Sequence, residues 1–462
     1  GVDVLLQNRR RLYERLARAY ELLNRWNEAE TIYHEMLAFA RDNALPEWIA
    51  TALNRLALVH ILGRWQPTKG VSLLEEARQI DGGRASLIET ECIFSQIRQY
   101  DFEQEAAISH AQRAVTLARE EGDEKLLARS LSTRAYARFG LPDALQQIEA
   151  DAREATRLYA GQGDRALEAD SLAMVGQAQR HQGRVQQSVD TMKEARTITV
   201  DIDNSWGQIN TSSHLAEGLL ELGQYGKALE MIEAGIATAR AHEHTALLAN
   251  TFSVRGTIYR AMRQLESASA DHEEAQKRFA TLPFTLLPAI IATHRCADAA
   301  LRSDWQTAYD FARQVLEVDE LAWLWVWCDA GFSYPAVIEA LWRAGEQEAA
   351  RAALQKYDAA TGNNPRYRLS FQTAAATLAK LEGNLEEAMR QWRKVVSGAR
   401  EMALPGELWP ALIELASLEI ARGDESAAKD ARREARQITQ RLASTIVDEE
   451  QRSTFLEATT VA

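Results

Sequence analysis

The sequence contains few of the residues that interrupt helices and few that could cross-link the chain. It has 9 prolines and 24 glycines among 462 residues, both below average usage. Its 3 cysteines, Cys92, Cys296 and Cys328, are odd in number and far apart in the chain. They therefore predict neither a disulfide framework nor a paired metal site. A reducing, cytoplasmic location is expected.

Long apolar runs and an excess of basic charge are also missing. No run of 18 apolar residues occurs, so no membrane helix is predicted, and no signal peptide begins the chain. The formal net charge of −13 disfavours binding to nucleic acid or to an anionic membrane. Because the chain begins at Gly1 without an initiator Met, we expect it to be part of a longer polypeptide.

The abundant residues are Ala, Leu, Glu, Arg and Gln, which favour helices, so the composition predicts an all-helical chain. A chain of 462 residues is too long for one conventional core and predicts either several domains or a repeat array. The segments 174–195, 214–235 and 253–275 align with one another at intervals of about 40 residues, which indicates repeats.

Small residues recur in phase with this interval. On a first helix they are Gly176, Ala216 and Gly256, and on a second helix Ser188, Ala228, Ala268, Ala308, Ala350, Ala388 and Ala428. Small side chains are needed where two helices cross closely. Between the helices stand Gly183, Gly223, Gly345, Gly383 and Gly423, with Arg263 and Ser303 at the two intervening turns. Glycine at this position predicts a left-handed turn that ends the first helix.

This spacing resembles the tetratricopeptide repeat. Gly176 and Gly256 match the family's small residue in its first helix, Tyr259 matches the aromatic residue, and Ser188, Ala228 and Ala268 match the alanine of the second helix. The period is about 40 residues instead of about 34, and the closing proline is mostly absent. The resemblance implies an all-α fold, a right-handed α-solenoid superhelix of about eleven helical hairpins with a C-terminal capping helix.

We expect one superhelical domain over residues 1–462. The repeats are predicted at 5–44, 46–82, 84–122, 124–163, 166–204, 206–244, 246–284, 286–321, 322–362, 366–402 and 406–442, with the cap at 443–462.

The stretch AWLWVWCDAGFSYP, residues 322–335, places three tryptophans in five positions. Such alternation is typical of a strand, but a lone strand among helices would have no partner. We therefore predict a helix that starts near Cys328 and in which Pro335 either kinks the axis or forces a restart.

Two interpretations of these tryptophans remain open. They fill an irregularity of the core, or one or two of them line a groove and stack on a ligand. In a helix Trp323 and Trp327 would share a face, and Trp325 would point away from it. Truncation of Trp325 to Ala should cost about 3–5 kcal/mol if that side chain is buried.

Motifs for catalysis, cofactors and metals are not complete. Gly226-Lys227 is followed by Ala228 and lacks the upstream glycine of a phosphate-binding loop. His242-Glu243-His244 has no evident third metal ligand. We therefore expect no enzymatic activity, no cofactor and no metal.

In tetratricopeptide proteins the first helix of each unit lines the concave side, so the resemblance implies candidate ligand-binding residues on those helices. They are Arg134, Arg138, Gln177, Arg180, His181, Asn210, Glu217, Asn250, Arg260, His294 and Asp298, together with Trp323 and Trp327 if the groove interpretation holds. Such a mixture suits a peptide or a polar small molecule. Replacing Arg180 and His181 by Ala is expected to weaken binding with little loss of thermal stability.

The long period, the long helices and the ending DEEQRSTFLEA resemble the C-terminal sensor domains of STAND signal-transduction ATPases of the maltotriose-responsive activator type. The resemblance implies a non-catalytic sensor that binds an unknown inducer, a small molecule or a protein, on its concave face. It also implies an upstream NTPase module in the same polypeptide, and no nucleic-acid or membrane partner. The alternative is a scaffold that binds a peptide or a partner protein along its groove.

Overall fold

A computed structural model describes residues 2–22, 25–63, 66–100, 103–282, 286–318, 321–325 and 329–460. These ranges are almost entirely helical and contain no strand, which confirms the predicted all-α class. No helix within them is both long and apolar enough to cross a bilayer.

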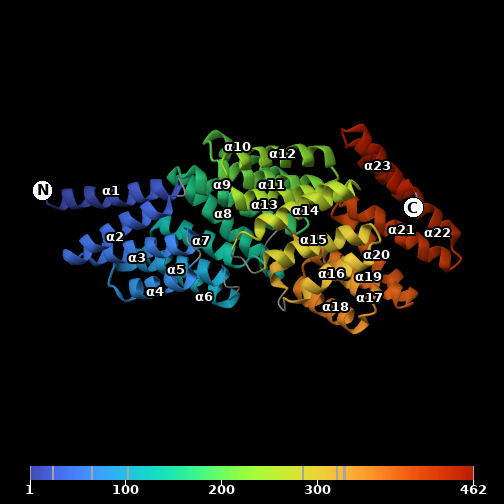
Figure 1. The fold of residues 1–462 in the computed structure, drawn as a ribbon, viewed down its shortest axis with the longest axis horizontal. Helices are drawn as coiled ribbons and strands as arrows, with labels where there is room; N and C mark the ends of the chain where they lie inside the picture. The colour runs from blue at the N-terminus through green and yellow to red at the C-terminus, as the bar shows by residue number, and fades with distance from the viewer. Residues whose placement is uncertain are drawn as a thin grey trace. The chain divides into compact units, whose positions relative to one another are not determined.

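Successive helices pack as hairpins, namely α1/α2, α3/α4, α5/α6 and the seven pairs from α9/α10 to α21/α22, so the described helices form a tetratricopeptide-like array, with α23 at its end (Figure 1). The α-helices are α1 Val2–Leu22, α2 Trp26–Asp42, α3 Pro46–Leu58, α4 Pro67–Gln79, α5 Gly83–Tyr100, α6 Gln104–Glu121, α7 Glu124–Ala137, α8 Leu145–Gln162, α9 Arg165–His181, α10 Val185–Asp201, α11 Ser205–Glu221, α12 Tyr225–Ala241, α13 Thr245–Ala261, α14 Leu265–Phe279, α15 Leu287–Leu301, α16 Trp305–Leu316, α17 Tyr334–Arg343, α18 Gln347–Thr361, α19 Pro365–Leu381, α20 Leu385–Glu401, α21 Pro405–Ala421, α22 Glu425–Ser444 and α23 Glu449–Thr460. Short helical segments are η1 Val59–Gly63, which is π-helical, and the 3₁₀ segments η2 Pro142–Ala144, η3 Ala322–Trp325 and η4 Ala330–Ser333.

The chain divides into two compact units. The N-terminal unit comprises residues 1–138 and 150–164, and the C-terminal unit comprises residues 139–149 and 165–462. The single domain predicted over residues 1–462 stays a prediction.

The turns inside the hairpins adopt the left-handed backbone that their glycines predict, for example φ +73° at Gly223. Arg263 and Ser303 keep the same conformation, with φ of +62° and +60°, although each carries a Cβ atom. A non-glycine residue pays about 1–2 kcal/mol for this conformation. The backbone of the repeat is therefore maintained even where the sequence departs from glycine.

Close helix crossings explain the recurring small residues. Ala228 and Ala268 are fully buried, and a Cβ atom on Gly256 of α13 would lie 2.7 Å from the imidazole Nε2 of His272 on α14. A larger side chain at such a position would have to push the helices apart.

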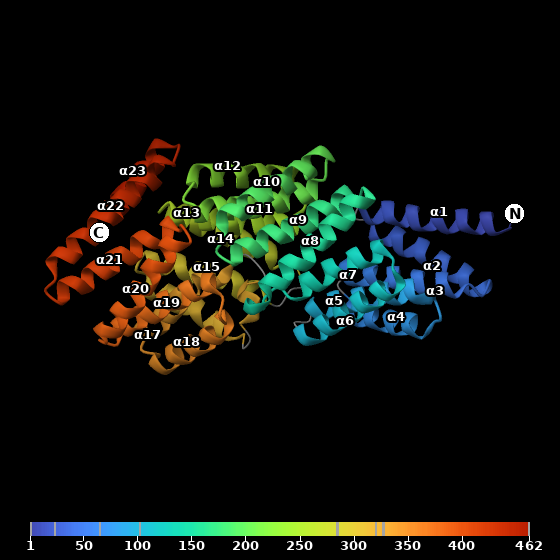
Figure 2. The same cartoon turned by 180° about the vertical axis from the view of Figure 1, so that it is seen from behind.

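Segments far apart in sequence meet within the C-terminal unit. The amide of Gly226 donates to the carbonyl oxygen of Thr445 at 3.0 Å, and the Thr445 hydroxyl donates to the carbonyl oxygen of Gly223 at 3.0 Å. The rings of Tyr225 and Phe455 meet edge to face at 6.0 Å, so the start of α12 contacts both the end of α22 and α23 (Figure 2). These contacts bring late helices against the middle of the array.

The tryptophan stretch differs from the prediction. The helix begins at Tyr334, not near Cys328, and Pro335 lies in its first turn, where it causes no kink. The predicted start near Cys328 was wrong, whereas the restart predicted as the alternative to a kink is what occurs, because proline fits the first turn of a helix, whose amides have no intrahelical partner. No strand occurs in 321–325 or 329–335. Trp327 and Cys328, and the side chain of Trp323, lie outside the described residues.

Trp325 belongs to the core, which confirms the first interpretation for this residue. Its side chain is 1% exposed, and its ring stacks on Tyr367 with 3.7 Å between centroids and 7° between planes. Its indole Nε1 donates to the carbonyl oxygen of Ala360 at 2.8 Å. Trp325 therefore joins η3 to α18 and α19.

Candidate ligand-binding cavity

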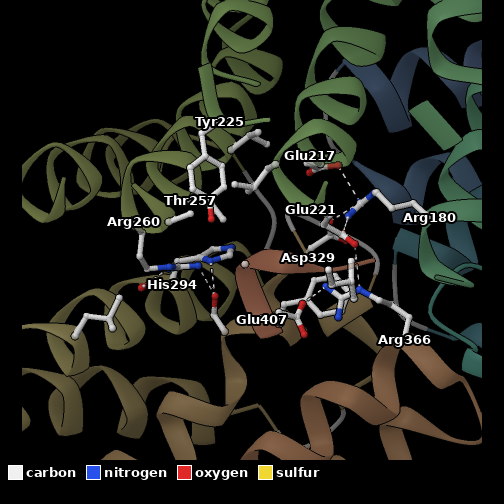
Figure 3. Close-up of a pocket in the computed structure, with 18 of the residues that line it drawn as sticks. Arg180, Glu217, Glu221, Tyr225, Thr257, Arg260, His294, Asp329, Arg366 and Glu407 are labelled. Atoms are coloured by element: carbon white, nitrogen blue, oxygen red, sulfur yellow. Dashed lines mark hydrogen bonds and ion pairs between the residues drawn. The ribbon is translucent and has the colours of Figure 1, made fainter. Parts of the chain in front are cut away.

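The C-terminal unit contains a cavity of about 240 Å³. Its lining comes mainly from the first helices of successive pairs, α9, α11, α13, α15, α19 and α21, and from η4 (Figure 3). The charged residues that line it are Arg180, Arg260, Arg263, Arg366, Glu217, Glu221, Asp329 and Glu407. Apolar residues such as Phe332 and Trp409 complete the wall.

Arg180, near the end of α9, is the centre of one wall. Its side chain is 3% exposed, and its guanidinium donates to Glu221 at 2.8 Å, to Glu217 at 2.9 Å and to Asp329. Burial lowers the pKa of Arg180, but the charges of Asp329, Glu217 and Glu221 outweigh it and raise this pKa well above its usual value. The guanidinium is therefore held charged, between carboxylates from α11 and from the segment before η4.

The burial of Arg180 changes the expected effect of its removal. Without the guanidinium, three buried or half-buried carboxylates would face one another, and breaking such a pair costs about 3–5 kcal/mol. Because both side chains are buried members of this network, the structure predicts a loss of stability when Arg180 and His181 are replaced by Ala, in place of the small change expected from the sequence.

His181 holds Asp329 from behind the cavity. Its Nε2 lies 2.9 Å from Asp329 Oδ1, and its Nδ1 lies 2.7 Å from the Tyr367 hydroxyl. Burial raises the pKa of the Asp329 carboxyl, but Arg180 and His181 outweigh it and lower this pKa far below its usual value. The carboxylate is thereby fixed in place at the cavity.

Arg366, on α19, forms the second cationic centre of this wall. Its guanidinium contacts Glu221 at 3.1 Å and Glu407 at 2.5 Å, and it lies 3.9 Å over the ring of Phe332. Its Nη1 is buried and has no hydrogen-bond partner. Burial raises the pKa of Glu407, as does Glu221, against the lowering effect of Arg366. Four carboxylates thus share two guanidinium groups here.

The opposite wall is built around Arg260 of α13. Its guanidinium donates to Ser333 Oγ at 2.7 Å and to Asp298 at 3.2 Å. His294 contacts the same Ser333 hydroxyl at 3.0 Å, and it stacks on His272 with 5.1 Å between ring centroids. Burial raises the pKa of Asp298, but contact with His272 at 2.5 Å and the charge of Arg260 lower it to about 2.

Arg263 lies beside this wall and lacks a counter-charge. No carboxylate of a described residue lies within ion-pair distance of it, and its guanidinium is 5.1 Å from the centroid of the Trp409 ring. Its Nη1 lies 3.5 Å from the carbonyl oxygen of Arg260. Burial, with the charge of Arg260, lowers the pKa of Arg263.

The cavity brings together some of the predicted residues. Arg180, Glu217, Arg260 and His294 line it, and His181 and Asp298 support lining residues from behind. Each remains a predicted ligand contact.

The other predicted residues do not line this cavity. Arg134 and Arg138 belong to the N-terminal unit, where both bind Asp151, at 2.6 and 2.9 Å. Gln177, Asn210 and Asn250 are half-buried side chains of α9, α11 and α13 that are not part of the lining. Trp323 and Trp327 are not described at the side-chain level.

Sequence reasoning missed five of the eight charged residues of the lining as ligand contacts. Glu221, Asp329, Arg366 and Glu407 belong to four different elements, and only tertiary packing unites them. Arg263 did carry a signal, because it stands where the other hairpins have glycine. Within the described ranges, no group of three His, Cys, Asp or Glu side chains is arranged to hold a metal ion.

Fold and cavity together define the class of molecule, a tetratricopeptide-like array of helical hairpins that surrounds a charged cavity. No family model and no curated protein matches the chain. Similar solved structures include a signal-transduction ATPase with numerous domains and a tetratricopeptide repeat sensor from Pyrococcus horikoshii, at 17% identity and TM-score 0.47, covering 74% of this chain and 50% of that chain. The human IFIT1 dimer with PPP-AAAA is similar at 14% identity and TM-score 0.46, covering 92% of this chain and 90% of that chain. The apo form of the quorum sensor NprR from B. thuringiensis is similar at 15% identity and TM-score 0.46, covering 75% of this chain and 99% of that chain. The chain thus spans half the length of the Pyrococcus protein.

Proposed function

We propose that this chain is a non-catalytic regulatory module that binds a small polar molecule in the cavity of its C-terminal unit. The observation that supports this proposal is the convergence of eight charged side chains from several hairpins on one cavity of about 240 Å³. Binding sites combine apolar walls with a few fixed polar groups in this way. Burying so many charges for packing alone would be unfavourable compared with an apolar core.

The elements around the cavity suit a regulatory role. The lining comes from six helices of different hairpins and from η4, so a ligand there would contact several repeats at once. A ligand that binds one arrangement of the hairpins better than another shifts their equilibrium. We propose that this shift is passed to a nucleotide-binding module upstream in the same polypeptide, as in a STAND sensor.

Native mass spectrometry of the purified chain, together with thermal-shift screening of a metabolite library, tests the binding role. A bound small molecule should be lost when the cavity is filled by Ala261→Phe, because Ala261 lines it. The control Ala237→Phe lies on the exposed side of α12 and should leave binding intact. Retention of the molecule in the cavity-filled variant would contradict the proposal.

The regulatory role needs the full-length polypeptide. An upstream nucleotide-binding module whose ATP hydrolysis changes when the cavity ligand is added would support the sensor. Absence of such a module would refute the sensor and leave the scaffold that binds a peptide or partner protein.

A further inference from the structure

Arg263 is an exception in the repeat. The equivalent turn residue is glycine in five other hairpins, and Arg263 and Ser303 keep the left-handed conformation at this position with a side chain. Ala44, Asp203, Glu243, Asp329 and Ala403 adopt a positive φ at other places in the chain. A strained residue of this kind persists where the structure or the function demands it. Ser303 is exposed, whereas Arg263 lines the cavity.

The charge of Arg263 is not balanced by a described residue. Its neighbours are the Trp409 ring and a backbone carbonyl group, and the nearby Arg260 adds a second positive charge that shares Asp298 with His272. A partly buried guanidinium without a counter-ion is unfavourable unless an anion approaches it. This end of the cavity therefore favours an anionic group.

On the wall around Arg180 and Arg366, carboxylates outnumber guanidinium groups. Arg180 and Arg366 face the carboxylates of Glu217, Glu221, Asp329 and Glu407. His181 contacts Asp329 at 2.9 Å and His214 contacts Glu217 at 2.9 Å, whereas Glu221 and Glu407 share the guanidinium of Arg366. Figure 3 shows Arg260 and His294 on one side of the cavity and Arg180, Glu217 and Glu221 on the other. This wall favours a cationic group.

We infer that the cavity binds a zwitterion between an amino acid and a dipeptide in size, with its carboxylate on Arg263 beside Trp409 and its ammonium group against the carboxylate wall at Glu407. This inference rests on the proposed binding function and adds the chemical class of the ligand. The volume of about 240 Å³ is below the range of about 300–1,000 Å³ that drug-sized ligands occupy. The unpartnered Nη1 of Arg366, a residue 2% exposed, offers a donor for an amide carbonyl oxygen.

Calorimetry with the purified chain tests the inference, using the twenty L-amino acids and a dipeptide set as probes. The tightest probe is then compared with its methyl ester, which lacks the carboxylate, and with its N-acetyl derivative, which lacks the ammonium charge. Arg263→Gly should weaken binding of the free probe by about tenfold or more, because a charge-assisted pair is lost. The same variant should leave the affinity of the methyl ester nearly unchanged. Glu407→Gln should weaken binding of the free probe and leave the affinity of the N-acetyl derivative nearly unchanged.

The variants are chosen so that folding is not the limiting factor. Arg263→Gly restores the residue of the other turns and should keep the melting temperature of the unliganded protein at or above the wild-type value. Ser303→Gly makes the same backbone change at an exposed turn and should not alter affinity. Arg343→Ala removes a guanidinium that lies 4.1 Å over the Trp305 ring outside the cavity, and affinity should again be unchanged.

Two results would overturn the inference. One is failure of every amino acid and dipeptide to bind, and the other is binding that Arg263→Gly does not weaken. Either result can occur while another molecule is bound by the wild-type protein and is lost in Ala261→Phe. In that case the cavity is still a binding site, and only the inferred class of ligand is wrong. If no molecule of any class is lost on filling the cavity, the proposed function fails as well.

Discussion

Truncation of Trp325 to Ala should destabilise the C-terminal unit by about 4 kcal/mol. Burial of a tryptophan side chain removes about 150–250 Å² of its surface from water. At about 25 cal/mol per Å², this area corresponds to a hydrophobic stabilisation of at most about 4–6 kcal/mol. Measured losses for Trp→Ala in cores are about 3–5 kcal/mol. The 1% exposure of Trp325 and its stacking on Tyr367 place it in this class.

A graded series separates packing from hydrogen bonding. Trp325→Phe keeps an aromatic ring against Tyr367 but loses the bond from Nε1 to the Ala360 carbonyl oxygen, so we expect a loss of about 1–2 kcal/mol. Trp206→Ala is the matched control, because Trp206 lies in the same unit and is 44% exposed. Its loss should be below about 1 kcal/mol.

Urea unfolding followed by circular dichroism measures these differences, and hydrogen exchange of peptides from α18 and α19 assigns the transition to the C-terminal unit. If Trp325→Ala and Trp206→Ala destabilise the protein equally, the core placement of Trp325 is refuted. The position of Tyr367, and through it that of His181, would then need another explanation.

Three further predictions concern the networks around the cavity. Arg180→Ala should lower the free energy of unfolding by about 3–5 kcal/mol in urea titrations, and an unchanged midpoint would contradict the buried ion network. Asp298, whose folded pKa is about 2, should contribute about 2 kcal/mol that is present above its ordinary pKa of 3.8 and lost as pH falls through about 2. Asp298→Asn should remove this pH dependence in acid unfolding curves, and a variant with the wild-type profile would assign the dependence to other groups. Gly256→Ala should cost about 1–3 kcal/mol, because the new Cβ would lie 2.7 Å from His272, whereas Gly161→Ala meets nothing within 4 Å and should cost nothing in thermal unfolding.

The amino-acid pattern predicted the hairpins because their determinants are local. Small residues at the crossings and glycine at the turns recur at a fixed interval, and the structure places Ala228 and Ala268 in the core and Gly223 in the left-handed region. The interval even assigned Arg263 to a turn in which the backbone overrides the preference for glycine. The tryptophan stretch broke the register, because Pro335 lies in the first turn of a short helix that begins at Tyr334.

The cavity could be predicted only in part. Arg180, Glu217, Arg260 and His294 were accessible to sequence reasoning because they lie on first helices at repeat spacing. Arg366 and Glu407 were not, because Arg366 meets Glu221, 145 residues away in the chain, and Glu407 joins the network through Arg366. No local pattern encodes such a pairing.

The sequence by itself determined the class of secondary structure, the interval of the repeat and the conformation of its turns, since each depends on contacts between residues near one another in the chain. Tertiary structure alone decided which charges are balanced and which are left for a ligand. That outcome depends on how hairpins far apart in sequence are packed together, as where Thr445 meets Gly226 and where Arg366 meets Glu221. The counter-charge missing at Arg263 is therefore a property of the packed unit and of no single repeat.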